Sequence, residues 1–284
     1  MTAHILFGAN NRTTGLFDLW SSTSETGSVA VDLGVAITLD FDPVRIGATT
    51  LFIGGSALGL PEVWSTDGTI AGTSAFLLPL GSGKQPIITA IVAFRGEAVI
   101  AAENSVTHSN SLWITDGTTA GATLIASGVA ASGFAVVGAT LYFTGAPDPF
   151  KAADKLLYSS DGTATGTVAV SPAASTVAPD AYASLANGDI LFENDALSGS
   201  VATAALWVTD GTTPGTHPVA AANLGSGAAQ GDFVSLGGEA LFSFAAGGLG
   251  GSALWISDGT AAGTRQIIIA VSYTHLTLPT TPYV

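Results

Sequence analysis

Five aspartates recur along the chain, and each is followed directly by a glycine and then a threonine. They are Asp67, Asp116, Asp161, Asp210 and Asp258. Carboxylate oxygens bind calcium, but a calcium site takes about six to eight oxygens and usually draws several carboxylates together. Each phrase offers one carboxylate, and equivalent positions on successive packed sheets would lie about 10 Å or more apart. We interpret the aspartates as turn-forming residues and keep calcium as the alternative.

Other side chains that could do chemistry show no pattern. The four histidines share no repeat position and no metal-ligand spacing: His4, His108, His217 and His275. Acidic residues outside the repeated phrase gather loosely at Asp189, Glu193 and Asp195. A carboxylate pair for glycoside hydrolysis could be assembled from different repeats, which keeps a hydrolase or lyase as an alternative. No catalytic, cofactor-binding or metal residue is assigned, and no cofactor is expected.

The composition excludes several partners. The 284 residues carry 21 acidic and 7 basic side chains, for a formal charge of −14. Nucleic-acid binding depends on clustered Lys and Arg, so no such partner is expected. No stretch reaches the ~18 apolar residues of a membrane span. The N-terminus lacks the charged and apolar regions of a cleaved signal peptide, and no cysteine is present for disulfides.

The Asp-Gly-Thr phrase belongs to a longer repeat that begins with Leu-Trp or a close variant. Five intact copies begin at Val63, Leu112, Leu157, Leu206 and Leu254. A degenerate sixth copy begins at Leu19 and lacks the Asp-Gly pair. The aromatic residues, which we call anchors, lie 44 to 49 residues apart: Trp20, Trp64, Trp113, Tyr158, Trp207 and Trp255. A period of this length indicates one supersecondary unit per repeat.

Each anchor follows a stretch that predicts a hairpin: a β-rich run, a turn with glycine, and a second apolar run. These stretches are 44–55, 92–103, 134–145, 182–194 and 233–245. The Leu-Trp run predicts a third strand, and the residues after the second glycine a fourth. Four strands per repeat is the size of a propeller blade. Residues 1–271 therefore predict one all-β propeller of about six four-stranded blades. Its first blade lacks its own first strand, because residues 4–8 align with a second strand.

Turn chemistry explains the residue types in the phrase. An Asp side chain accepts hydrogen bonds from the backbone that follows it, and Gly adopts the positive φ that other residues resist. We expect these residues to form the turn between the third and fourth strands, where they play a structural role. The motif comprises Trp64, Asp67, Gly68, Trp113, Asp116, Gly117, Tyr158, Asp161, Gly162, Trp207, Asp210, Gly211, Trp255, Asp258 and Gly259.

At these residues the chain resembles bacterial repeat proteins with Glu-Leu-Trp-x-Ser/Thr-Asp-Gly-Thr-x-x-Gly-Thr units. The resemblance covers about residues 1–271 and implies propeller-like blades in secreted or surface-associated proteins. The family's Glu survives only as Glu62, so a role for it would be lost in most blades. Residues 272–284 share no pattern with the repeat and resemble a translated sequencing adaptor, so we interpret them as a non-native tail.

Near-identical repeats with bland variation between them favour a non-enzymatic propeller. We expect it to bind a protein or glycan through its loop faces, as a monomer, outside the cell or at its surface. One alternative is a structural spacer in a larger bacterial surface adhesin. The other is a glycan-active hydrolase or lyase that uses the central funnel.

Overall fold

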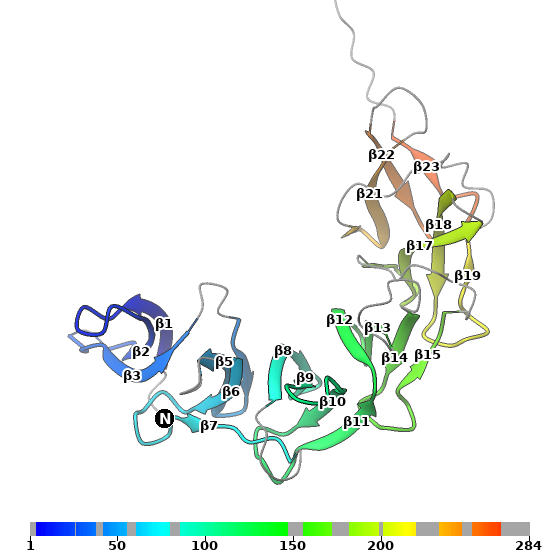
Figure 1. The fold of residues 1–284 in the computed structure, drawn as a ribbon. Coiled ribbons are helices and arrows are strands. Elements are labelled where there is room, and N and C mark those ends of the chain that lie inside the picture. Colours follow the sequence, from blue (N-terminus) through cyan, green and yellow to red (C-terminus); the bar gives the residue numbers. More distant parts are fainter. Residues whose placement is uncertain are drawn as a thin grey trace, which may run out of the picture.

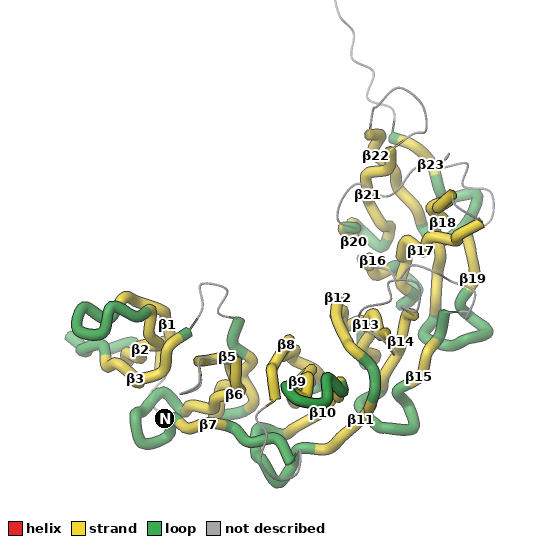
Figure 2. Tube along the Cα trace, in the orientation of Figure 1, coloured by secondary structure: helices red, strands yellow, loops and turns green. Residues whose placement is uncertain are grey.

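The computed structural model consists of strands and the turns between them, with no helix among the residues that it describes (Figure 2). The described residues are 4–25, 27–37, 42–55, 61–79, 86–146, 156–171, 182–198, 201–219, 233–245 and 252–267. The predicted tail, 272–284, and His275 lie outside them. The described residues include no helix long and apolar enough to cross a membrane.

The strands form six antiparallel sheets, which we number from the N-terminus. Sheet 1 holds β1 (His4–Asn10), β2 (Phe17–Thr23) and β3 (Val31–Ala36). Sheet 2 holds β4 (Val44–Ile46), β5 (Thr49–Gly55), β6 (Pro61–Thr66) and β7 (Ser74–Ala75). Sheet 3 holds β8 (Pro86–Phe94), β9 (Glu97–Asn104), β10 (Asn110–Thr115) and β11 (Thr123–Ser127).

The second half repeats this arrangement. Sheet 4 holds β12 (Ala130–Val137), β13 (Thr140–Ala146), β14 (Leu156–Ser160) and β15 (Val168–Ala169). Sheet 5 holds β16 (Tyr182–Ser184), β17 (Ile190–Ser198), β18 (Val201–Thr209) and β19 (His217–Pro218). Sheet 6 holds β20 (Val234–Leu236), β21 (Glu239–Ala245), β22 (Ser252–Ser257) and β23 (Arg265–Gln266).

This topology confirms the predicted fold class. Each sheet contains strands that follow one another in the chain, and sheet 1 has three strands where the others have four. Its β1 pairs with β2 through Phe7 and Trp20, just as the second strand of sheet 2 pairs with the third through Phe52 and Trp64. The strand missing from sheet 1 is therefore the first one. Figure 1 shows the six sheets along an open arc, with sheets 1 and 6 at its ends.

Each sheet has two apolar faces because side chains alternate along a strand. The anchor and the residue opposite it on the second strand share the anchor face. The residue before the anchor lies on the other, which we call the leucine face. The cluster between sheets 1 and 2 combines Leu19 of the first sheet with Phe52 and Trp64 of the second. The four later pairs of sheets pack in the same way.

These five interfaces form the core. Burying one Phe or Leu side chain fully contributes about 1.5–3 kcal/mol, and each interface buries several. In every interface the leucine face of one sheet covers the anchor face of the next. The chain therefore builds its core between sheets.

Candidate functional site

The Asp-Gly-Thr phrase forms a compact turn, which we call the corner, between the third and fourth strands of sheets 2 to 6. In sheet 2, Asp67 Oδ1 accepts hydrogen bonds from the Thr69 backbone N–H, at 2.9 Å, and from its hydroxyl, at 2.7 Å. The backbone N–H of Gly72 donates to the same hydroxyl at 3.0 Å. These two bonds from Thr69 lower the pKa of Asp67. The other four corners repeat both bonds and the direction of the pKa shift.

Both glycines of the corner are required by geometry. Gly68 has φ +93°, in the left-handed region that side chains with a Cβ rarely adopt. Gly72 packs beneath the carboxylate of Asp67, and a Cβ there would collide with that carboxylate. The second glycine of every corner stands in the same relation to its aspartate. The repeated spacing of Asp, Gly and Gly therefore follows from one local structure.

Each corner also docks on the preceding sheet. Ser159 of sheet 4 donates its hydroxyl to the Gly211 carbonyl of sheet 5 at 2.8 Å. A Cβ on Gly211 would lie 2.8 Å from the Tyr142 hydroxyl of sheet 4. Arg95 of sheet 3 donates to the Asp161 carbonyl of sheet 4 at 3.1 Å. The first glycine thus lets the backbone of one sheet approach the side chains of its neighbour.

Tyr142 is the residue of sheet 4 that lies against the sheet 5 corner. Its side chain is buried, and burial, followed by the charges of Asp189 and Asp210, raises its pKa to about 12. The neutral phenol is therefore the form present under the corner at neutral pH.

The five aspartates lie one to a sheet and are not brought together. Among the described residues, no group of three or more His, Cys, Asp or Glu side chains is placed to hold a metal ion. Each aspartate instead directs one carboxylate oxygen at its own threonine. His108 lies near Glu103, with Nδ1 2.6 Å from Oε1, and His217 is exposed on β19.

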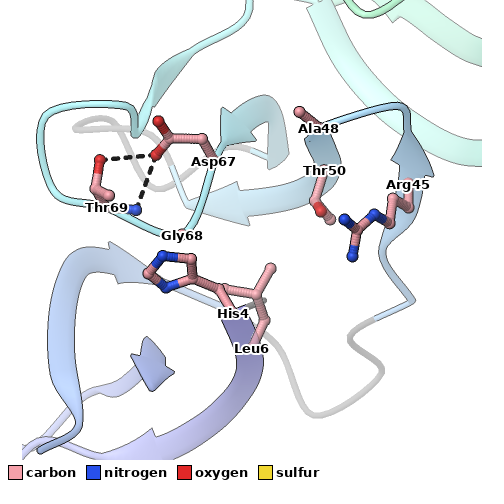
Figure 3. A pocket seen from close by; sticks show the side chains of 8 residues that line it. All are labelled: His4, Leu6, Arg45, Ala48, Thr50, Asp67, Gly68 and Thr69. Atoms are coloured by element: carbon pink, nitrogen blue, oxygen red, sulfur yellow. Dashed lines mark hydrogen bonds between the residues drawn. The ribbon is translucent and has the colours of Figure 1, made fainter. Parts of the chain in front are cut away.

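A hollow of about 370 Å³ lies between sheets 1 and 2, beside the first intact corner (Figure 3). Asp67, Gly68 and Thr69 form one side of it, and Arg45 lies on the opposite side, on the strand of the neighbouring hairpin. The His4 ring from β1 lies against Gly68. The first glycines of sheets 3, 4 and 6 meet aliphatic or aromatic side chains at this contact, such as Ile46 beside Gly117, and that of sheet 5 meets Tyr142. Among the described corners, only that of sheet 2 has an imidazole against its first glycine.

His4 is oriented by Ser21, with Nδ1 2.9 Å from the Ser21 hydroxyl. A Ser–His pair can activate a nucleophile, but Ser21 is only 2% exposed, so a substrate cannot reach its oxygen here. The pair positions the imidazole at the edge of the hollow. Sequence reasoning set His4 aside because it matches no repeat position. That mismatch was the available signal, since no other described corner has a histidine against its first glycine.

Arg45 supplies the positive charge of the hollow. Its Nε donates to the Gly47 carbonyl at 3.1 Å, which holds the side chain along the hairpin turn. Among the described residues Arg45 forms no ion pair. A guanidinium binds carboxylates well. Asp67 also lines the hollow, with its carboxylate turned toward Thr69 (Figure 3). The arrangement suits a small ligand with a carboxylate at one end and an ammonium group at the other.

Comparison with known proteins bears on the fold. No protein-family model matches the chain, and no curated protein sequence does. Among solved structures it is similar to dipeptidyl peptidase 4 of Porphyromonas gingivalis (TM-score 0.62, 9% identity, 92% of this chain and 45% of that one). It is also similar to a puromycin hydrolase (TM-score 0.52, 15% identity, 92% and 44%). A Mycobacterium tuberculosis puromycin-hydrolyzing peptidase gives a TM-score of 0.50 (12% identity, 95% and 44%).

These similarities show a β-propeller fold. The chain spans less than half the length of each of these solved proteins, so the comparison concerns only the propeller-like part. At such low identity, the fold is all that is shared.

The expected function is corrected by this finding. We expected a non-enzymatic display propeller, with an adhesin spacer or a glycan-active hydrolase or lyase as alternatives. The solved structures named above are peptidases, and none is an adhesin or a glycan-active enzyme. The expectation was wrong because it treated bland repeats as a sign of display. Because the match covers less than half of each peptidase chain, the hydrolytic residues of those peptidases need not lie in the part that matches.

Proposed function

We propose that this chain is the substrate-handling propeller of a peptidase-related protein. The similarity to peptidases over more than nine-tenths of the chain supports this proposal most directly. The groups that cleave the substrate are then supplied outside the propeller, by further sequence or by a partner chain. The propeller itself binds and orients short peptides.

The hollow between sheets 1 and 2 is the peptide-binding site in this proposal. A free peptide carries a carboxylate and an ammonium group, and the lining of the hollow includes the opposite charges of Arg45 and Asp67. The hydroxyl of Thr50 and the imidazole of His4 add polar groups on the lining. Since Arg45 and Asp67 are exposed, solvent weakens both interactions, and we expect modest affinity that falls with salt.

Isothermal titration with triglycine tests the binding site. Triglycine with free termini is expected to bind, and Arg45→Ala to weaken binding about tenfold, as loss of one charge-assisted hydrogen bond pair would do. Triglycine blocked at both ends lacks the charges and is expected to bind as weakly as the variant does. Arg12→Ala, which removes an exposed arginine outside this hollow, is the matched control and should bind like the parent. Equal binding by all three proteins, or none, would refute the site.

Peptidase relatedness needs a separate test. Recovery of the intact coding sequence is expected to show a hydrolytic domain beside the repeats or a partner gene that encodes one. Purified together with the propeller, that domain or partner should cleave a dipeptidyl reporter substrate. An intact coding sequence that contains only blades, with no partner gene for a hydrolytic domain, would overturn the proposal.

A further inference from the structure

The five internal interfaces show what covers each face of a sheet. The residue opposite the anchor is fully buried in sheets 2 to 6: Phe52, Ile100, Phe143, Phe192 and Phe242. The residue before the anchor is equally buried in sheets 1 to 5: Leu19, Val63, Leu112, Leu157 and Leu206. In every case the cover is the opposite kind of face on the neighbouring sheet.

The anchor face of sheet 1 has no such cover among the described residues. Phe7, which pairs with Trp20, is 36% exposed, and Ile5 beside it is 53% exposed. The residues that correspond to Ile5 in sheets 4 and 5, Leu141 and Ile190, are completely buried. Contiguous exposed apolar residues mark an interaction surface, and Ile5 and Phe7 lie on the same face of β1.

The leucine face of sheet 6 is also partly exposed, although Ile256 on it is buried. Leu254, which precedes the anchor Trp255, is 36% exposed, and Leu236 on β20 is 56% exposed. The whole of β20 is exposed, whereas Val44 and Ile46 on the equivalent strand of sheet 2 are buried. Sheet 6 therefore presents the aliphatic half of an interface that the chain builds five times internally.

We propose that the leucine face of sheet 6 binds the anchor face of sheet 1 in a second copy of this chain. The two surfaces carry the two kinds of face that pair in every internal interface, so we expect one to fit the other. Figure 1 places them at opposite ends of the open arc, and a second copy can dock without changing any internal interface. This departs from the monomer expected from the sequence. The association goes beyond the proposed peptide-handling role.

The interface is head-to-tail, since one copy contributes one face and its neighbour the other. Such interfaces form rings when the rotation closes and open chains when it does not. The turn of sheet 1 lacks the Asp-Gly pair, so the contact made by the other corners is missing. Both copies are also strongly acidic. We therefore expect reversible association that strengthens as salt screens the repulsion.

Sedimentation velocity over a range of protein concentrations tests the proposal. The parent chain is expected to form dimers and larger species as concentration rises. Phe7→Asp and Leu254→Asp should each weaken association about 100-fold, because a carboxylate would be buried without a partner. Ile70→Asp changes an exposed isoleucine in the corner of sheet 2 and should leave association unchanged. Circular dichroism melting checks that each variant remains folded.

Mixing the two end variants provides the decisive measurement. Phe7→Asp retains a normal leucine face, and Leu254→Asp retains a normal anchor face. An equimolar mixture should give a heterodimer and nothing larger, with the affinity of the parent contact. A monomer at all concentrations would mean that another segment or the chain's own other end covers the faces, and would overturn the proposal. Association that persists in both single variants would also overturn it.

Discussion

The turn of sheet 1 and the corner of sheet 2 close in the same way but differ in how they meet a neighbour. In sheet 2 the hydroxyls of Thr66 and Thr73 lie 2.7 Å apart, and Thr73 donates to the Thr69 carbonyl at 2.6 Å. In sheet 1 the hydroxyls of Ser22 and Ser28 lie 3.0 Å apart. Ser28 also donates to a carbonyl within the turn, at 2.7 Å. This hydroxyl clasp is therefore present without an Asp-Gly pair.

Sheet 3 shows the opposite combination. Ala122 occupies the position of Thr73 and cannot form the clasp, while Asp116 keeps both bonds to Thr118. The corner therefore contains two separable parts. The clasp closes the turn, and the Asp-Gly pair shapes it to dock on the preceding sheet. Sheet 1 has no preceding sheet among the described residues, and there the pair is missing.

The largest expected effect comes from crowding an intact corner. Gly215→Ala places a Cβ against the carboxylate of Asp210 and should destabilise the chain by about 2–3 kcal/mol in urea unfolding, as overpacking does. Gly27→Ala in the sheet 1 turn meets open space and only a positive φ, so we expect about 1 kcal/mol.

A double variant sharpens this prediction. In Asp210→Ala/Gly215→Ala the colliding carboxylate is absent, so the total loss should be smaller than the sum of the two single losses. Strict additivity would show that the second glycine is not required by the aspartate.

Acid should weaken the corners. The bonds from threonine lower the pKa of each corner aspartate in the folded state. Their stabilisation is therefore complete above the unfolded-state pKa of about 4 and is lost as pH falls through the folded-state values. Asp210→Asn keeps an acceptor oxygen but cannot titrate. Chemical unfolding at a series of pH values should show lower stability than the parent at pH ~7, because the neutral amide lacks the charge that strengthens these bonds, and a shallower acid dependence. An unchanged dependence would contradict this origin.

The smallest expected effect is a gain. Ala122→Thr should restore the clasp in sheet 3 by pairing with Thr115, and stabilise the chain by about 0.5–1 kcal/mol. Ala122→Val has the same shape without the hydroxyl and is the matched control. Equal melting temperatures for the two variants would show that the clasp contributes nothing.

Much of the fold was predictable because its information is local and repeated. Anchors 44 to 49 residues apart indicated the blades, and the alignment of Phe7 with the other second strands indicated the missing strand. The hollow was not predictable in this way. It depends on which side chain of one sheet faces Gly68 in the next, and His4 and Gly68 are far apart in sequence.

The open arc and the function escaped prediction for related reasons. The angle between neighbouring sheets is determined by side-chain packing, which a repeat pattern does not specify. The interpretation as a display protein depended on a missing catalytic pattern, and a missing pattern in one part of a protein says little about the whole.

Hydrogen exchange at the sheet 5 corner tests most directly whether corners dock on the preceding sheet. Ser159→Ala removes the hydroxyl that sheet 4 donates to the Gly211 carbonyl. We predict that the backbone amides of Thr212 and Gly215 then exchange faster, while those of the sheet 1 turn, including Ser28, keep their rates. Unchanged protection at Thr212 and Gly215 would contradict the docking role, because the corner would then be held by its own bonds alone.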